Sequence, residues 1–427
     1  MNRGSGPTRG GANLPALRGY NEALLLDLLR GAGPGGLGRS ELAARTGLTP
    51  QAVSKIMVRL GAEGFVAEAG RAASTGGKPR TLLRLVPEAR HAVGVHLDRD
   101  ELRAVRVDLA GAVTGTSAGP LDFGAGPDAV VEAVVRAVLR IADPAGPPLL
   151  GVGVAAPGPL DHRAGVMGRV TGFPDWDGFP LRQVLEERLG LPVLLDKDTN
   201  AGAASAVAAG PVPAPAASTA RAVPVAPGAA VQAAPVPPAP GGSAEGGSAV
   251  PPVADASPAP GAPPGPGARV PATAAPASAD PGASVYLHVA TGLGAGLWLN
   301  GEVYRGARSA AGEFGHQVLS LDGPECRCGA RGCAEVLCLD AVARGDLPEA
   351  ARILGEGAAN LVALLDVERV FLGGRVVAAA PEVFLAGVRA VLAARVLNRP
   401  PPAVALAAAG VAQGAAELVL APFFGRT

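Results

Sequence analysis

The sequence predicts an α/β protein with a winged helix-turn-helix at its N-terminus and a long insertion rich in Ala and Pro. Three observations lead to this fold class: short helical patterns followed by a β-hairpin at the N-terminus, strands that alternate with helices from Ala92 onward, and 19 of the 42 prolines within residues 211–281. Alternating strands and helices are typical of α/β domains. A chain of 427 residues is long enough for two or three domains.

The N-terminal module is predicted from helix signals followed by strand signals. Ser40 and Thr49 can each cap a helix, and Pro50 suits the first turn after Thr49. The predicted elements are helices at Asn21–Arg30, Ser40–Arg45 and Pro50–Ala62, then strands at 65–67 and 81–85 around a turn at 74–79. We therefore expect a disordered start over residues 1–19 and a winged helix-turn-helix over residues 20–88.

The distribution of charge indicates an anionic partner for this module. Residues 1–90 hold 13 Lys and Arg against 6 Asp and Glu, although the whole chain has 37 of each kind. A basic module on an acidic body is typical of proteins that bind nucleic acid.

The body is predicted as two lobes separated by the insertion. Residues 211–283 contain five charged residues and no aromatic one, so they cannot bury enough apolar surface to offset their chain entropy, and we expect them to be disordered. The first lobe is expected over residues 89–210 and the second over 284–427, with the C-terminal helix returning to the first lobe. The apolar run from Ala403 to Phe424 is Ala-rich and follows three prolines, which favours a buried strand and a packed helix over a membrane span.

The cysteines predict a structural zinc site. All four lie between positions 326 and 338, and His316, Cys326, Cys328 and Cys333 have the spacing H-x9-C-x-C-x4-C. Three thiolates and one imidazole suit tetrahedral Zn²⁺ without an open position. Unligated buried thiols are the alternative. Cys338 lies outside the spacing and is expected in the core, while Arg327 and Arg331 can offset the negative charge of the site.

The segment from Ala311 to Glu335 that contains these ligands resembles the signature of the ROK family, which comprises repressors, open reading frames and sugar kinases. Glycine-rich segments at residues 151–158, 291–296 and 372–374 fit the same family, and the N-terminal module fits its regulators. The resemblance implies a two-lobed body of the actin–hexokinase (ribonuclease H-like) type with a sugar cleft between the lobes.

The resemblance also implies sugar contacts at Asp198, Glu313, His316 and Glu335, with His316 shared between zinc and sugar. For Glu313 and Glu335 the alternative role is support of the zinc loop, and for Asp198 it is a helix cap. Lys197 stands where the family has Asn. A cation at this position favours an acidic or phosphorylated sugar.

The first phosphate turn argues against kinase activity. Family kinases carry Asp-x-Gly-Gly-Thr after the first strand, whereas this chain has His96-Leu97-Asp98-Arg99-Asp100. Without the two glycines the backbone cannot approach phosphate closely, and two carboxylates would repel it. We therefore expect no enzyme and no catalytic residue, with Asp198 a vestigial base. The alternative is an ATP-dependent, glucokinase-like ROK sugar kinase with an appended DNA-binding domain.

The expected function is a sugar-responsive transcriptional regulator, in its simplest form a repressor of a carbohydrate-use operon. The helix Pro50–Ala62 would enter the major groove, with contacts from recognition-helix residues Gln51, Ser54, Lys55 and Arg59 and from wing residues Lys78 and Arg80. Expected partners are operator DNA, a sugar or sugar phosphate effector, and a second copy of the chain in a homodimer or dimer of dimers. We expect a cytoplasmic bacterial protein, on the nucleoid when bound to DNA, without membrane attachment. A regulator that has lost its ligand site is a third interpretation.

Overall fold

The computed structural model describes residues 14–71, 80–208, 282–395 and 400–426, with side chains from residue 19 onward. Most of the expected insertion (residues 211–281), the expected disordered start up to residue 13 and Lys78 lie outside the described residues. Residues 14–19, which we also expected in the disordered start, belong to the first helix. The described residues form one compact unit.

The N-terminal residues form three helices and a small antiparallel sheet of order β1-β3-β2. Thr49 caps α3 as predicted, because its Oγ1 accepts from the Ala52 N–H at 3.2 Å. The cap predicted at Ser40 is wrong: Gly38 is the N-cap residue of α2, and Ser40 lies inside that helix. The elements are α1 (Leu14–Ala32), β1 (Leu37–Gly38), α2 (Arg39–Thr46), α3 (Pro50–Ala62), β2 (Val66–Arg71) and β3 (Thr81–Leu85).

Two five-stranded mixed sheets form the body, and they repeat one topology. Their orders, β6-β5-β4-β7-β10 and β13-β12-β11-β14-β15, are both 3-2-1-4-5 when the strands of each sheet are counted along the chain. This repeat confirms the predicted fold class. The strands are β4 (His91–Leu97), β5 (Glu101–Asp108), β6 (Val113–Pro120), β7 (Leu149–Ala156), β10 (Val193–Lys197), β11 (Ser284–Val289), β12 (Leu293–Leu299), β13 (Glu302–Val303), β14 (Arg369–Gly373) and β15 (Ala403–Leu406), with a separate pair β8 (Leu160–Asp161) and β9 (Val166–Met167).

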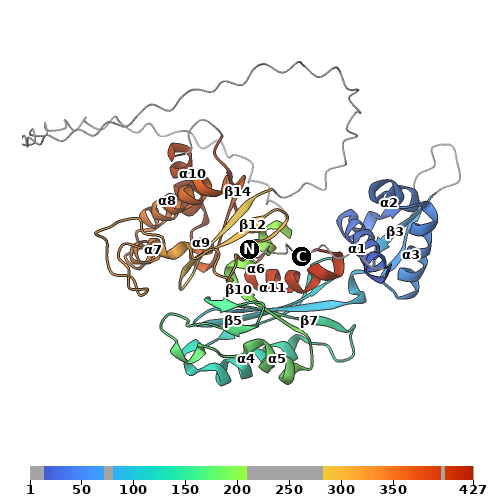
Figure 1. The fold of residues 1–427 in the computed structure, drawn as a ribbon, viewed down its shortest axis with the longest axis horizontal. Coiled ribbons are helices and arrows are strands. Elements are labelled where there is room, and N and C mark those ends of the chain that lie inside the picture. Colours follow the sequence, from blue (N-terminus) through green and yellow to red (C-terminus); the bar gives the residue numbers. More distant parts are fainter. Residues whose placement is uncertain (1–13, 72–79, 209–281, 396–399, 427) are drawn as a thin grey trace, which may run out of the picture. The chain divides into compact units, whose positions relative to one another are not determined.

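Helices cover both sheets, and two of them lie between the sheets (Figure 1). α11 packs on β4 and β7 of the first sheet, α6 packs on β11 and β12 of the second, and the two helices pack on each other. α4 and α5 cover the opposite face of the first sheet. The helices are α4 (Pro127–Ile141), α5 (Leu181–Leu189), α6 (Asp198–Ala208), α7 (Ala334–Ala343), α8 (Leu347–Leu365), α9 (Arg375–Ala379), α10 (Pro381–Arg395) and α11 (Val411–Leu420).

Glycines let this central layer pack backbone against backbone. A Cβ at Gly94 of β4 would lie 1.8 Å from the Ala412 carbonyl oxygen of α11, and a Cβ at Gly414 would lie 1.8 Å from the Ala201 carbonyl oxygen of α6. Real atoms never approach so closely, so only glycine fits at these positions.

The C-terminal segment Ala403–Phe424 forms β15 and then α11, which confirms the predicted strand and packed helix. Among the described helices, none is both long and apolar enough to cross a membrane. The end of α11 meets α1 of the winged helix-turn-helix, where Arg30 and Glu417 form an ion pair. The same apolar cluster contains Leu29 of α1 and Leu420 of α11, so this contact continues the core.

Candidate functional site

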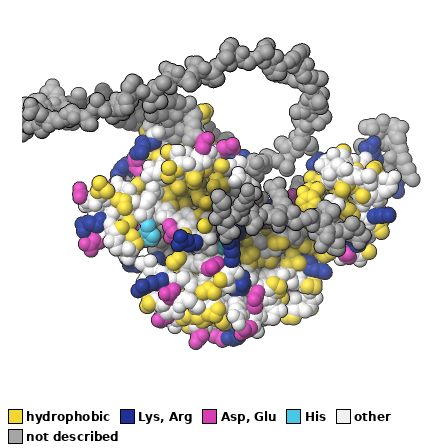
Figure 2. Space-filling view, in the orientation of Figure 1, with side chains coloured by type: hydrophobic (Ala, Val, Ile, Leu, Met, Phe, Trp, Pro, Cys, Tyr) yellow, Lys and Arg dark blue, Asp and Glu magenta, His cyan; other side chains and the backbone are white. Residues whose placement is uncertain are grey.

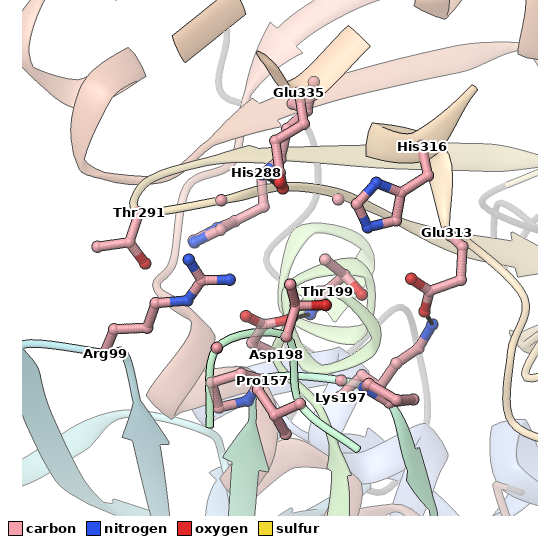
Figure 3. Close-up of a pocket in the computed structure, with 18 of the residues that line it drawn as sticks. Arg99, Pro157, Lys197, Asp198, Thr199, His288, Thr291, Glu313, His316 and Glu335 are labelled. Carbon is pink, nitrogen blue, oxygen red and sulfur yellow. Dashed lines mark hydrogen bonds and ion pairs between the residues drawn. The ribbon is translucent and has the colours of Figure 1, made fainter. Parts of the chain in front are cut away.

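A pocket of about 760 Å³ lies where strands of both sheets end and α6 begins. β4 leads into Asp98 and Arg99, β10 ends at Lys197, and β11 leads into Thr291. Ligands of open α/β sheets bind at this carboxyl end of the strands, because loops rather than regular backbone form the surface there. Charged side chains of both signs surround the pocket, as Figure 3 shows, and histidine, acidic and basic side chains lie near one another on this face of the molecule (Figure 2).

All four residues that the family resemblance assigns to sugar line this pocket: Asp198, Glu313, His316 and Glu335. Asp198 is the first residue of α6, and burial raises the pKa of its carboxyl group. Its side chain accepts from the N–H of the next residue, Thr199, at 2.6 Å. A carboxylate at this position can accept hydrogen bonds from the hydroxyl groups of a ligand.

Lys197 is not free to meet an anionic ligand. Its ammonium group donates to Glu313 Oε1 at 3.1 Å and to the Ala311 carbonyl, and only 3% of its side chain is exposed. The preference for an acidic sugar that we expected from Lys197 therefore loses its basis, because Glu313 already balances this charge. Sequence spacing could not reveal the pair, since its members are 116 residues apart.

Three arginines that we did not assign to the pocket also line it: Arg99, Arg169 and Arg327. Among the described residues, none of the three has a carboxylate within ion-pair distance. Arg99 points between Thr291 and Asp198 (Figure 3). Arg327 was expected to balance the zinc site together with Arg331, but Arg331 pairs with Glu325 at 3.0 Å instead.

The carboxylates of the turn after β4 form hydrogen bonds and an ion pair within the chain. Asp98 accepts from the Thr291 hydroxyl and, at 2.8 Å, from the Arg99 N–H. Burial raises the pKa of Asp98, but these two hydrogen bonds, together with the nearby His96 and Arg375, hold the pKa below its usual value. Asp100 pairs with Arg375 of α9 at 2.8 Å. Both acidic residues thus link the turn after β4 to the half of the body built on the second sheet.

Glu335 lies against the second glycine-rich turn. Its Oε2 accepts from the Leu293 N–H at 3.0 Å, within Thr291-Gly292-Leu293-Gly294. This contact differs from the support of the zinc loop that we considered as an alternative. A carboxylate on a backbone N–H takes the position that a phosphate oxygen would need.

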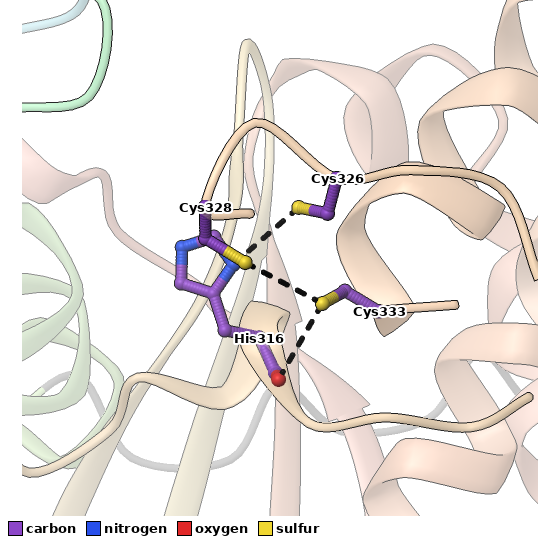
Figure 4. Close-up of side chains that lie close together, drawn as sticks. All are labelled: His316, Cys326, Cys328 and Cys333. Carbon is purple, nitrogen blue, oxygen red and sulfur yellow. Dashed lines mark hydrogen bonds between the residues drawn. The ribbon is translucent and has the colours of Figure 1, made fainter. Parts of the chain in front are cut away.

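The four predicted metal ligands lie together (Figure 4), with one ligand atom of each within 4.8 Å of the others. Cys328 Sγ is 3.7 Å from Cys333 Sγ, and Cys326 Sγ is 3.7 Å from His316 Nδ1. Thiolates bound to one tetrahedral Zn²⁺ at about 2.3 Å lie about 3.8 Å apart, so the observed spacing fits the ion.

The loop that carries these ligands requires a tight backbone. Gly332 has φ of +63°, and a Cβ there would lie 1.7 Å from the Ser320 carbonyl oxygen. Cys338 is fully buried and stands outside the cluster, as we expected. His316 belongs to both the cluster and the pocket lining.

On the winged helix-turn-helix, α3 exposes Gln51 and Lys55, while Ser54 is half-buried. Arg59 is also exposed, but it forms an ion pair with Glu22 of α1. Arg80 is exposed at the start of β3. The face that we assigned to base contacts is therefore accessible, and Arg59 is already partnered.

Comparison with known proteins shows similarity to one family. A model of the ROK family matches residues 101–210 and 272–344. The xylose repressor of Bacillus spizizenii is 22% identical over 320 residues, which cover 74% of this chain and 65% of the repressor. The match thus spans just under two thirds of that relative's length. The glucokinase of Thermotoga maritima is 23% identical over 212 residues, which cover 50% of this chain and 45% of the kinase.

A solved structure shares the fold across both the N-terminal module and the body. It is the crystal structure of a ROK family transcriptional regulator described as a homolog of the E. coli MLC protein. Its TM-score is 0.65 at 16% identity, and the alignment covers 96% of this chain and 97% of that one. The family model over residues 101–210 and 272–344 and this shared fold both point to the ROK family, to which the chain is similar.

Proposed function

We propose that the protein is a sugar-responsive transcriptional regulator, in its simplest form a repressor. Two features of the same chain carry the proposal. The helix that would read DNA, α3, exposes polar side chains, and contacts within the chain occupy the turn after β4, which would bind nucleotide phosphates in a kinase. Residues 20–88 would bind operator DNA, and the lobes at residues 89–210 and 284–427 would hold the effector. Regulation would follow if effector binding changes how two DNA-binding modules are spaced in a homodimer or dimer of dimers.

DNA recognition is assigned to Gln51, Ser54 and Lys55, which can reach base edges, with Arg80 near the backbone. Exposure of Gln51 and Lys55 on α3 supports this assignment. Arg59 would leave Glu22 to contact phosphate, or it would hold α1 against α3.

The effector is assigned to the pocket with Asp198, Glu313, His316 and Glu335. Arg99, Arg169 and Arg327, which lack carboxylate partners among the described residues, support an effector that carries an anionic group, such as a sugar phosphate. Zn²⁺ held by His316, Cys326, Cys328 and Cys333 would fix the loop and the orientation of the His316 ring. In that role the metal would stabilise the fold of the loop and would take no part in a reaction.

Against a kinase stand the Asp98–Thr291, Asp100–Arg375 and Glu335–Leu293 contacts, which take the donors that a triphosphate needs. Because the chain is also similar to a glucokinase, phosphoryl transfer from ATP must be tested directly. We expect no ATP turnover with any hexose above the rate without protein.

The test uses the full chain and duplexes selected from random sequence for tight binding. We expect a pseudo-palindromic site whose affinity changes at least tenfold with the effector, chosen from a panel of neutral and 6-phosphorylated sugars. Gln51→Ala should weaken binding to the selected site, and Asp198→Asn should abolish the sugar response while leaving DNA affinity intact. Duplex binding without sequence preference, or hexose-dependent ATP consumption, would contradict the proposal.

A further inference from the structure

A second cluster of metal-ligating side chains lies at the floor of the pocket. In the described part of the chain, His96, Asp198 and His288 form the one such group besides the cysteine cluster, and one ligand atom of each lies within 4.8 Å of the others. They come from three elements: β4, the first turn of α6, and β11. The fold therefore brings together residues that are up to 192 positions apart in the sequence.

Internal hydrogen bonds do not explain why His96 is placed there. Its Nε2 is buried and has no hydrogen-bond partner among the described residues. An unpaired buried polar atom is costly, so such atoms are rare without a ligand or water. Burial and the neighbouring His288 lower the pKa of His96 to about 3, so this ring is neutral at pH 7 and keeps a lone pair for a metal.

The other two side chains are oriented as ligands would be. The Tyr286 hydroxyl lies 2.9 Å from His288 Nδ1, which leaves the opposite ring nitrogen to the cluster. A polar partner on the far nitrogen is the usual way in which proteins orient a metal-binding histidine. Asp198 stands at the start of α6 and lines the pocket, with a carboxylate oxygen within 4.8 Å of a ring nitrogen of each histidine.

We propose that His96, Asp198 and His288 form a second metal site, distinct from the cysteine cluster, which binds a divalent first-row transition ion such as Zn²⁺. Two imidazoles and one carboxylate are the donor set of sites that keep an open position, whereas Mg²⁺ prefers oxygen ligands throughout. Ligand atoms on one such ion lie about 3.5 Å apart, so small side-chain rotations must draw the cluster together.

The open positions of this ion would face the effector. Asp198 and His288 line the pocket, so a bound ion could accept a hydroxyl or carboxylate oxygen of the ligand. This part of the inference rests on the proposed function, whereas binding of the ion itself does not. The site would make effector affinity depend on the metal.

The experiment titrates Co²⁺ into the full chain with zinc retained in the cysteine cluster, without DNA or sugar. We expect one further equivalent to bind, with weak visible d–d bands and no strong near-ultraviolet thiolate band. His96→Gln and His288→Gln should each weaken binding at least 100-fold. His91→Gln, which changes another buried histidine of β4, should bind like the wild type.

Circular dichroism and one retained zinc per chain check that each variant is folded. A wild-type chain that takes up no further Co²⁺ overturns the proposal whatever the variants do, and so does binding that produces a thiolate band. A protein that binds Co²⁺ in this way yet ignores every duplex would refute the proposed function and leave the metal site standing.

Discussion

Glu417 is one of few carboxylates that the described fold buries, and its partner Arg30 comes from a different part of the chain. One guanidinium nitrogen of Arg30 donates to both carboxylate oxygens, at 2.7 and 2.9 Å. The same guanidinium lies 4.7 Å from the centroid of the Phe424 ring. Removal of one member of a buried pair leaves the other charge without compensation, and the loss exceeds the net worth of the pair.

Glu417→Gln should therefore lower the free energy of unfolding by about 3 kcal/mol, measured by urea denaturation. The control is Glu132→Gln, which breaks the Arg188–Glu132 pair whose side chains are both 45% exposed. Its cost should stay below about 1 kcal/mol, because water solvates exposed charges well. Equal costs for the two variants would mean that the buried pair does not stabilise the contact between α1 and α11.

The cysteine cluster makes a second prediction at the scale of single residues. Cys333→Ser should lower the zinc content by one equivalent per chain, measured by atomic emission, because a hydroxyl is a much poorer zinc ligand than a thiolate. Cys338→Ala changes a buried cysteine five residues away and should leave the zinc content unchanged. A zinc content that does not fall in Cys333→Ser would contradict the assignment of a zinc ion to the cysteine cluster.

At the scale of elements, β4 and β7 present the glycines Gly94 and Gly153 to α11, and α11 presents Gly414 to α6. The clash predicted for a Cβ at Gly94 involves backbone atoms, which cannot rotate away as the end of a long side chain could. A methyl group at Gly94 would therefore force α11 to move as a whole.

Gly94→Ala should destabilise the protein by at least about 2 kcal/mol, because overpacking forces a backbone shift. The control is Gly119→Ala in β6, where a Cβ would meet nothing within 4 Å. It should change stability by less than about 1 kcal/mol. A thermal melt of both variants distinguishes these outcomes, and equal midpoints would show that α11 tolerates the shift.

The elements differ in how well the sequence predicts them. A capping signal located α3 and a strand pattern located β3 at their observed bounds, because these signals are local. The two-residue strand β1 has no periodicity to detect. The zinc ligands were found because three of the four lie within eight residues. His288 lies in the apolar pattern of β11, and only the fold brings it to His96 and Asp198, so no local signal marked it.

For the whole molecule, the excess of basic residues in the N-terminal 90 positions predicts salt-dependent DNA binding. Each phosphate contact releases counterions, so affinity should fall at least about 1000-fold between 50 and 200 mM salt for about six contacts. Arg80→Ala, at the residue assigned to the DNA backbone, should weaken binding and make the dependence on salt shallower by about one unit of the logarithmic slope. Arg352→Ala, which removes an exposed arginine paired within α8, should change neither. Fluorescence anisotropy with the selected duplex measures both quantities.

The central helices α6 and α11 pack backbone against backbone where Gly414 meets the Ala201 carbonyl oxygen. A contact between backbone atoms has no rotamers that could absorb a small movement. We expect any displacement of Asp198 at the start of α6 to reach α11 undiminished, and through Glu417 to reach α1. The residues that line the pocket could then change over evolution to suit a new sugar without loss of the coupling between the pocket and α1. One methyl group added where the central helices meet would abolish this coupling.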